Sequence, residues 1–247
     1  MGHVNDPVYN IARMRHTIRT ALQLCALCVA VSGTAAAQSL FLDGAAFASI
    51  ERRNNVEPPG SLGASLKDGG TVAGGGLTVG TWLTPRVTLR LEVALPATLR
   101  REATFSQVFP GAGGIPQMTY SYSFQLLDQG RTFSTLLGYH TARRHGVQLG
   151  YLGGAAFVVQ PQRIRNEFHN PYVVAVNPIV GSPGGVTVRD DVHVDETRTT
   201  LHSVAAAVGL DADVALSAHI SAVPQMRVVG LSNGLAIRPG VAVRMHW

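Results

Sequence analysis

Residues 86–95 read RVTLRLEVAL, and this stretch decides the fold class. Aliphatic side chains occupy almost every second position from Val87 to Leu95, whereas Arg90 and Glu92 lie between them. Successive side chains of a β-strand point to opposite faces. A period of two therefore predicts a strand with one apolar and one polar face.

The end of the chain, residues 235–247 (LAIRPGVAVRMHW), has the same period. Its aliphatic residues and Trp247 share one face, and Arg238 and Arg244 share the other with small residues. Weaker alternation predicts six more strands, at about 39–51, 71–83, 119–140, 147–160, 199–216 and 219–231. We therefore expect an all-β chain, a closed antiparallel up-and-down barrel of eight strands.

The connections between these strands alternate in length. Short turns are expected at Thr84-Pro85, 141–146 and Ser217-Ala218. Long connections rich in Gly, Pro, Asn and Asp are expected at 52–70, 100–118 and 161–198, and the last link, Ser232–Gly234, is a tight hairpin. Such alternation is typical of an outer-membrane barrel, with short turns in the periplasm and longer loops outside. It also places both ends of an even-stranded chain on the periplasmic side.

Composition excludes one class of partner. Only 14% of the residues are charged, 27 are glycine, and the single lysine, Lys67, accompanies nineteen arginines. The formal net charge is +5, but the basic residues are scattered singly or in pairs without interleaved aromatic residues. We therefore expect no nucleic-acid partner.

The N-terminal residues carry an export signal. A basic stretch after Met14 precedes an apolar run at about 21–31, and small residues follow up to Ala37. This pattern is typical of a cleaved secretory signal, and we expect cleavage after Ala37. The chain then divides into an N-terminal extension with its signal peptide at 1–37 and a barrel domain at 38–247. The sequence leaves open whether the start is Met1 or Met14.

Both cysteines, Cys25 and Cys28, lie inside the predicted signal, so we expect a mature chain without disulfides. After Gln38, no apolar segment has the length of a transmembrane helix. In lipid, every backbone N–H and C=O must be paired internally, so strands cross a bilayer only as a closed barrel. Export, scarce lysine and a terminal aromatic residue favour a barrel with its apolar face outward, in the outer membrane of a Gram-negative cell.

The last strand resembles the C-terminal assembly signal of outer-membrane β-barrels. The residues that carry this resemblance are the alternate apolar residues Val241, Val243, Met245 and Trp247. Residues 38–247 as a whole resemble the small eight-stranded barrels of the outer membrane protein A type, without a peptidoglycan-binding domain. The resemblance implies insertion by the barrel assembly machinery. Pro224 and Pro239 depart from the pattern, and we expect β-bulges at both.

Charged residues gather on the inward face of the predicted strands. The set comprises Asp43, Glu51, Arg90, Glu92, Asp211, Asp213, Arg227, Arg238 and Arg244. An eight-stranded barrel is just wide enough for side chains to fill, and buried charges of both signs must pair. Two interpretations follow: a salt-bridged plug that rigidifies the barrel, or a narrow polar channel lined by the same groups.

The function classes follow from these two interpretations. The first is a structural or interaction barrel that displays long external loops over a largely plugged lumen, with an unidentified loop ligand. The alternative is a small porin-like pore for ions or small solutes. Glycine-rich segments, in the second strand and at 150–154, favour some open space inside and hence the pore.

An outer-membrane lipid-acting enzyme is the third class. The only adjacent His/Ser pair is His202-Ser203, but neighbouring residues of a strand face opposite sides and cannot form a nucleophile–base pair. The other histidines show no metal-binding spacing. The acidic run 189–196 (RDDVHVDE) is interpreted as part of a solvated external loop rather than a cation site. We expect no catalytic residue, metal or cofactor.

Aromatic residues and arginines suggest contacts with the membrane. We expect an interfacial girdle formed by Tyr120, Tyr122, Phe124, Tyr139, Tyr151 and Trp247. Contact with lipopolysaccharide is expected through the arginines near the loops, which are Arg52, Arg53, Arg100 and Arg101. The expected partners are thus outer-membrane lipids, lipopolysaccharide and the assembly machinery, and the barrel is expected to be a monomer.

Overall fold

The computed structural model describes residues 40–53, 66, 68–110, 117–176 and 185–247. The predicted export signal, its cleavage site and both cysteines lie outside these residues. Among the described residues, no helix is long and apolar enough to cross a membrane.

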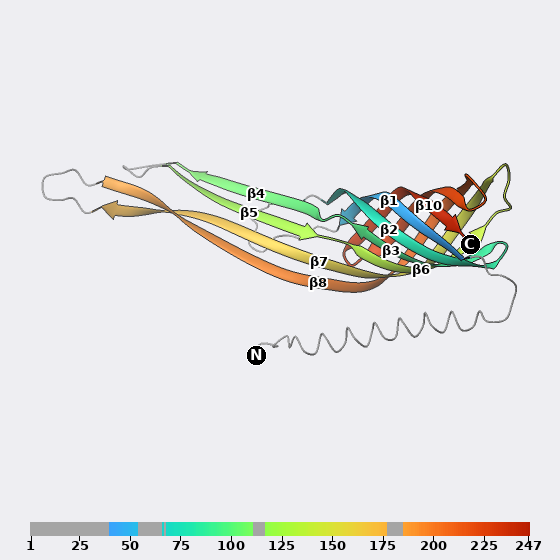
Figure 1. The fold of residues 1–247 in the computed structure, drawn as a ribbon. Coiled ribbons are helices and arrows are strands. Elements are labelled where there is room, and N and C mark those ends of the chain that lie inside the picture. Colours follow the sequence, from blue (N-terminus) through green and yellow to red (C-terminus); the bar gives the residue numbers. More distant parts are fainter. Residues whose placement is uncertain (1–39, 54–65, 67, 111–116, 177–184) are drawn as a thin grey trace, which may run out of the picture. The chain divides into compact units, whose positions relative to one another are not determined.

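Ten strands make up the described fold (Figure 1). They are β1 (Leu40–Arg53), β2 (Gly69–Thr84), β3 (Val87–Pro96), β4 (Leu99–Phe109), β5 (Met118–Asp128), β6 (Arg131–His140), β7 (Val147–Val176), β8 (Gly185–Ala215), β9 (Ile220–Leu231) and β10 (Gly234–His246). Every pairing between them is antiparallel.

Eight of the strands close into a ring in the order β1-β2-β3-β6-β7-β8-β9-β10, and β10 returns to β1. The prediction of a closed antiparallel barrel of eight strands is therefore confirmed. The two ends of the described chain meet in this closure, where the Trp247 backbone N–H donates to the Leu40 carbonyl over 3.1 Å. Closure leaves the barrel wall without a free edge.

The remaining strands form an extension of the barrel. A short break separates β3 from β4, and another separates β5 from β6. By contrast, β7 and β8 each continue from the barrel into the extension as one uninterrupted strand. Beyond the ring, β4, β5, β7 and β8 pair in that order as a four-stranded sheet (Figure 1). We call this sheet the extension; it comprises β4, β5, residues 162–176 of β7 and residues 185–199 of β8.

The prediction of long loops at 100–118 and 161–198 is therefore wrong, because most of these residues are in strands. The physical reason is that these strands carry few aliphatic residues on their outer face. Polar and charged side chains pair there across neighbouring strands, as Arg163 does with Glu196 at 2.5 Å. Part of the predicted loop 52–70 is also strand, since β1 extends to Arg53 and β2 begins at Gly69.

The predicted bulges at Pro224 and Pro239 are absent from the described ladders. Each proline's strand pairs with two neighbouring strands, and with one of them the pairing is interrupted at the proline. The register is the same on both sides of this interruption, so no residue is inserted. Each proline thus loses backbone hydrogen bonding without shifting the strand. The described register shift lies elsewhere, between Trp82 and Thr84 in β2.

Short turns join strands at the end of the barrel opposite the extension. The turn between β6 and β7 contains His145 at a φ of 50° and Gly146 at a φ of 81°. Two successive positive φ values are characteristic of a type I′ hairpin turn, whose twist matches that of the flanking strands. The sequence Arg-His-Gly-Val allows this because glycine occupies the second positive position at no steric cost.

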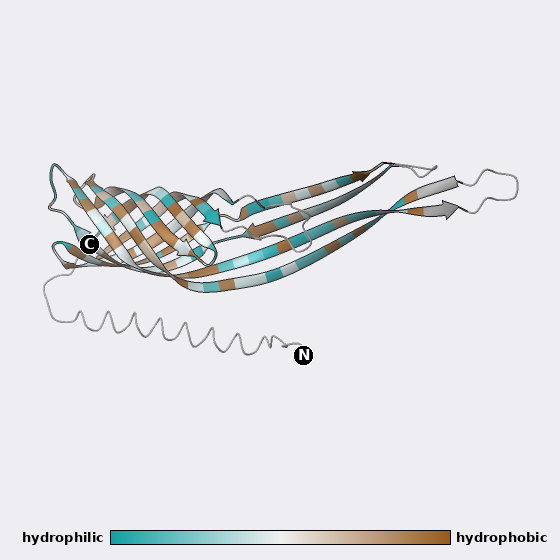
Figure 2. Cartoon of the chain, turned by 180° about the vertical axis from the view of Figure 1, so that it is seen from behind, coloured by the Kyte–Doolittle hydropathy of each residue, from teal (hydrophilic) through white to brown (hydrophobic). Residues whose placement is uncertain are grey.

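Apolar and polar residues alternate along the strands of the barrel wall (Figure 2). Large apolar residues cover the outer face, and polar and charged residues are buried inside together with some apolar ones. Large aliphatic side chains such as Leu77, Leu137 and Val204 are more than half exposed on the outer face. Residues between them on the same strands, such as Thr78 and Ser134, are buried. This arrangement is the reverse of that in a soluble barrel and matches a barrel whose outer face meets lipid.

Candidate functional site

The barrel interior, with the adjoining base of the extension where Arg101 and Asp128 lie, is the first candidate site. Six carboxylates and six arginines are buried there: Asp43, Glu51, Glu92, Asp128, Asp211 and Asp213, with Arg53, Arg90, Arg101, Arg227, Arg238 and Arg244. All nine charged residues predicted to point inward belong to this set. The two signs are equal in number, so the buried side chains carry no net formal charge when all are ionised.

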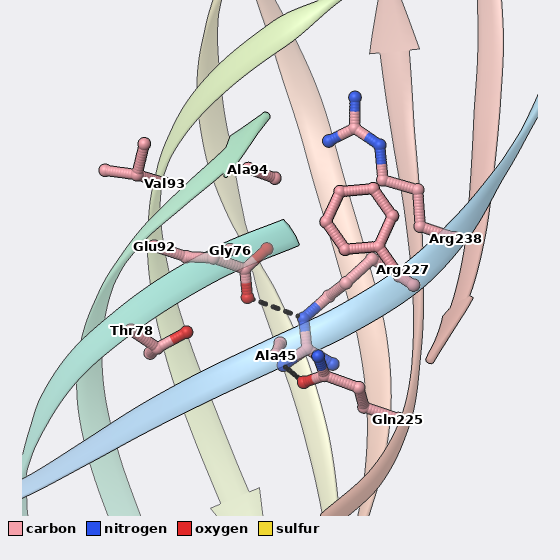
Figure 3. Close-up of a pocket in the computed structure, with 10 residues that line it drawn as sticks. Ala45, Gly76, Thr78, Glu92, Val93, Ala94, Gln225, Arg227 and Arg238 are labelled. Atoms are coloured by element: carbon pink, nitrogen blue, oxygen red, sulfur yellow. Dashed lines mark hydrogen bonds and ion pairs between the residues drawn. The ribbon is translucent and has the colours of Figure 1, made fainter. Parts of the chain in front are cut away.

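The larger group of charges centres on Asp211 in β8. This carboxylate pairs with Arg90, accepts a hydrogen bond from Nη1 of Arg227 at 2.6 Å and lies 3.7 Å from Arg244. Nε of Arg227 also donates to Glu92 at 2.9 Å (Figure 3). One carboxylate therefore joins arginines from three strands of the ring: β3, β9 and β10.

Arg244 extends this group toward the turn end of the barrel. Its guanidinium donates to Asp43 at 2.7 Å and to Asp213 at 2.9 Å. Asp213 is also paired with Arg143, which lies on the turn after β6, at 3.0 Å. Removing a charge from water costs free energy, and several well-placed partners offset that cost. A buried charge that loses its partner no longer has this compensation.

A second, smaller group lies at the end of the barrel next to the extension. Arg53 pairs with Glu51 and, at 3.0 Å, with Asp128, which also accepts a bond from Arg101 at 3.2 Å. Arg53 and Arg101 were missed as inward residues because both were assigned to loops. Asp128 was missed because 119–140 was predicted as one strand, whereas β5 ends at Asp128 and β6 begins at Arg131. The period of two, continued from Glu51 to Arg53 and from Thr132 back to Asp128, would have included two of them.

Arg238 is held by neutral groups. It donates to the Thr132 hydroxyl at 2.6 Å and to the Gly130 carbonyl at 2.7 Å, and its guanidinium lies 5.5 Å from the centre of the Phe47 ring. A hydroxyl, a carbonyl and an aromatic face all stabilise a cation that has no carboxylate at hydrogen-bonding distance among the described residues.

The glycine-rich segments do not leave open space. A Cβ on Gly80 would lie 2.1 Å from the Phe41 ring, and one on Gly74 would lie 2.4 Å from the Phe47 ring. The His140 ring covers Gly150 in the same way, at 2.7 Å. The interpretation of these glycines as lumen was therefore wrong, because aromatic rings from neighbouring strands occupy the room that the missing side chains leave.

A small hollow lies between these groups. It is lined by residues that include Phe47, Thr78, Glu92, Arg227 and Arg238 (Figure 3), and its volume is about 10 Å³. That volume accommodates about one water molecule. In the described part of the barrel, this hollow offers no passage for a solute.

Some of the arginines and aromatic residues that were expected at the membrane surface are buried instead. Arg53 and Arg101 are buried in the interior ion pairs, so they cannot contact lipopolysaccharide, whereas Arg52 and Arg100 are exposed. Tyr122 and Phe124 are buried in the extension rather than in an aromatic girdle. Tyr139, Tyr151 and Trp247 are more than half exposed on the barrel wall, and Tyr120 is half-buried beside Phe109.

The adjacent residues His202 and Ser203 do not contact each other, because their side chains lie on opposite faces of β8. His202 is exposed and stacks on the Phe157 ring, whereas the Ser203 hydroxyl bonds to that of Ser232 at 2.9 Å. The acidic run 189–196 is not a loop: it lies in β8, and its side chains alternate between the two faces of the extension. No group of three His, Cys, Asp or Glu residues in the described part of the chain could hold a metal ion.

The four residues of the predicted assembly signal lie on β10, which pairs with β1 and so completes the ring. Val241, Val243, Met245 and Trp247 are each about half exposed or more on the outer face. A closed ring of eight antiparallel strands with an apolar exterior and an ion-paired interior decides the class. The chain has the fold of a small outer-membrane β-barrel.

Comparisons with known proteins find similar solved structures but no related sequence. No family model and no curated protein matches the sequence. Among solved structures, Ail, the attachment invasion locus protein of Yersinia pestis, is similar with 10% identity and a TM-score of 0.41, over 85% of this chain and 98% of that chain. The outer membrane protein OprG from Pseudomonas aeruginosa is similar with 10% identity and a TM-score of 0.42, over 85% of this chain and 96% of that chain.

Proposed function

We propose that the mature chain is an integral outer-membrane protein with an interaction role, which holds the extension above the cell surface on a closed, ion-paired barrel. The observation that carries this proposal is the contrast between a filled interior and a large projecting sheet. Twelve buried charges and aromatic rings occupy the space through which a pore would conduct. The strands β7 and β8, by contrast, continue far beyond the ring.

The orientation follows from where the strands end. Both ends of the described barrel and the turns after β2, β6 and β8 lie at one end, and the extension lies at the other. Outer-membrane barrels keep their short turns in the periplasm and their long connections outside. This orientation places the extension in contact with the medium around the cell.

The level of the membrane surface can be located along single strands. On the outer face of β7, apolar Phe157 and Val159 give way to Arg163 and Arg165. The outer face thus changes from apolar to charged within a few residues. Such a change is expected where the medium around the strand changes from lipid to water.

A row of arginines marks this level on the outer face. The row crosses the four neighbouring strands β4, β5, β7 and β8 at one register. Its residues in that order are Arg100, Leu127, Arg163 and Arg198. Arginine binds phosphate through its planar donor fork. We propose that Arg100, Arg163 and Arg198, with the exposed Arg52, contact the phosphates of outer-membrane lipids and lipopolysaccharide. We likewise propose that β10 is recognised by the barrel assembly machinery.

The interior argues against the porin-like alternative, and conductance tests the choice. The chain would be expressed with its own leader in a Gram-negative host, purified from the outer membrane and added to a planar bilayer. We expect a folded protein, shown by a heat-dependent shift on a gel, that gives no steady current steps. Reproducible steps that change when Arg90 or Glu92 is neutralised would establish a pore and overturn the proposal.

A further inference from the structure

The strand β8 has a free edge in the extension. From Gly185 to Ala206 it pairs with β7 on one side, and its pairing with β9 begins only at Ala207. No described strand pairs with the other side of these residues (Figure 1). The side chains from Arg189 to Thr200 are all exposed. An edge of this kind presents a row of unpaired N–H and C=O groups to another chain.

Several charged side chains along this edge have no partner among the described residues. On one face of β8, alternate positions carry Arg189, Asp191, His193 and Asp195. None of the four takes part in an ion pair or a side-chain hydrogen bond with another described residue, whereas the opposite face is rich in such pairs. Edge strands commonly carry charge to prevent pairing, but here both signs alternate in a self-complementary order.

We propose that this edge pairs with the same edge of a second copy of the chain, held in a facing membrane. The inference rests on the proposed function, because it requires the extension to be outside the cell. Two identical edges that continue one sheet are related by a two-fold axis perpendicular to the sheet, so the strands are antiparallel. The two barrels then lie at opposite ends of the joined sheet, which fits two cells and not one.

The charges select the alignment. A two-fold axis at Val192 places Arg189 opposite the partner's Asp195 and Asp191 opposite the partner's His193, each pair occurring twice by symmetry. Val192, which is 48% exposed, meets its own copy at the centre. Sliding to an axis at Asp191 opposes that residue to its own copy, and an axis at His193 opposes Asp191 to the partner's Asp195. An axis at Asp190 opposes Arg189 to the partner's Asp191 but leaves His193 and Asp195 opposite uncharged residues, so it forms half as many charge pairs. Opposite charges across an antiparallel pair stabilise it, and like charges destabilise it.

The same alignment fits the room outside the membrane. With the axis at Val192, Gly185 of one copy lies opposite the partner's Thr199, at the level of the arginine row. An axis at Val194 would carry Gly185 on to the partner's Ser203, next to Val204 in the apolar band of the barrel. Each joined edge is short and exposed, so single contacts are weak. Many copies on two facing cells act together through multivalency.

Complementary charge variants test the pairing on whole cells. One variant makes the four positions acidic, through Arg189→Asp and His193→Asp, and the other makes them basic, through Asp191→Arg and Asp195→Arg. Cells that express the unchanged chain are expected to clump and sediment. Cells with either double variant alone are expected to stay dispersed, and a mixture of the two kinds is expected to form mixed clumps, scored with two fluorescent labels.

A matched pair of variants controls for general surface charge. Arg165→Asp with Ser106→Asp, and Glu102→Arg with Glu167→Arg, change charges on the other face and away from the edge. Each is expected to clump alone as the unchanged chain does. Arg189→Asp by itself is expected to reduce clumping several-fold, because with the axis at Val192 each Arg189 faces the partner's Asp195, and the change makes both of these contacts repulsive.

Each result decides the proposal. Protease trimming of intact cells and the heat-dependent gel shift first show that the extension is displayed on a folded barrel; without that display the proposed function itself fails. Given display, dispersed cells with the unchanged chain overturn pairing between copies and leave the edge to an extended segment of another protein. Double variants that clump alone, a mixture that stays dispersed, or control variants that behave like the edge variants also overturn it.

Discussion

The barrel and the extension share strands but expose opposite kinds of side chain on their outer face. On β7 this face carries Phe157 and Val159 in the barrel and Arg163 and Arg165 beyond the ring. The inner face buries a mixture of polar and apolar residues in the barrel, such as Gln160 and Val158, and beyond the ring it packs Ile164 and Phe168 against an apolar cluster. That cluster comprises Leu66, Ala103, Tyr122, Phe124 and Leu126. The comparison shows that the surrounding medium, and not the strand itself, decides which face is apolar.

The two regions also differ in what holds them together. The barrel relies on a closed ladder and on groups of buried ion pairs, in which Asp211, Asp213 and Arg244 each have several partners. The extension relies on one small apolar cluster and on exposed ion pairs between neighbouring strands. We therefore expect changes in the barrel to act on the whole domain, and changes in the extension to act locally.

The largest effect is expected from removing the carboxylate on which the interior charges centre. Asp211→Leu would leave Arg90, Arg227 and Arg244 buried with fewer partners. We expect a loss of about 3–5 kcal/mol in the free energy of unfolding, measured by urea denaturation in detergent. Glu196→Gln, which removes exposed pairs in the extension, is the control and should cost about 1 kcal/mol or less. Equal losses would contradict the distinction between the regions.

A truncation in the extension tests whether that region unfolds by itself. Phe124→Ala removes a fully buried ring from the apolar cluster and should cost about 3 kcal/mol locally. We expect protease to cut the extension of this variant on intact cells while the barrel keeps its heat-dependent gel shift. Thr104→Ala, on an exposed position of β4, should leave the cutting pattern unchanged. A variant that loses the barrel shift as well would show that the two regions unfold together.

A smaller effect is expected where glycine makes room for an aromatic ring in the barrel. Gly80→Ala would force its new methyl group against Phe41 and should cost about 1–3 kcal/mol. Adding Phe41→Leu should recover part of that loss. Gly153→Ala is the control, because a Cβ there would meet no atom within 4 Å. Equal urea midpoints for Gly80→Ala and Gly153→Ala would refute the packing argument.

The smallest effect concerns a histidine in the extension. The Asp190 carboxylate beside His169, helped by Glu167, raises the pKa of that imidazole above its usual 6.5. A raised pKa means that the contact stabilises the sheet fully below about pH 6.5 and loses this effect as the pH rises through the raised value. Asp190→Asn should lower the pKa of His169, measured by NMR titration. An unchanged pKa would show that the contact between β7 and β8 does not form.

The sequence by itself predicted the fold class and most of the interior. The stretch RVTLRLEVAL contains the alternation that places Arg90 and Glu92 inside, and the same rule applied to β10 placed Arg238 and Arg244 there. Alternation is a local property, so it can be read without knowing which strands are neighbours. This rule failed beyond the barrel, where the outer face is no longer apolar. The alternation there has few aliphatic residues on that face, so the segments were predicted as loops.

Only the tertiary structure decided which residues meet. Asp211 and Arg90 lie 121 positions apart in the sequence, and the rings that fill the space above Gly74 and Gly80 come from another strand. The free edge of β8 likewise exists because β9 pairs only from Ala207 onward. Side-chain direction is set by the strand itself, whereas partners, filled space and free edges depend on how strands are arranged around the ring.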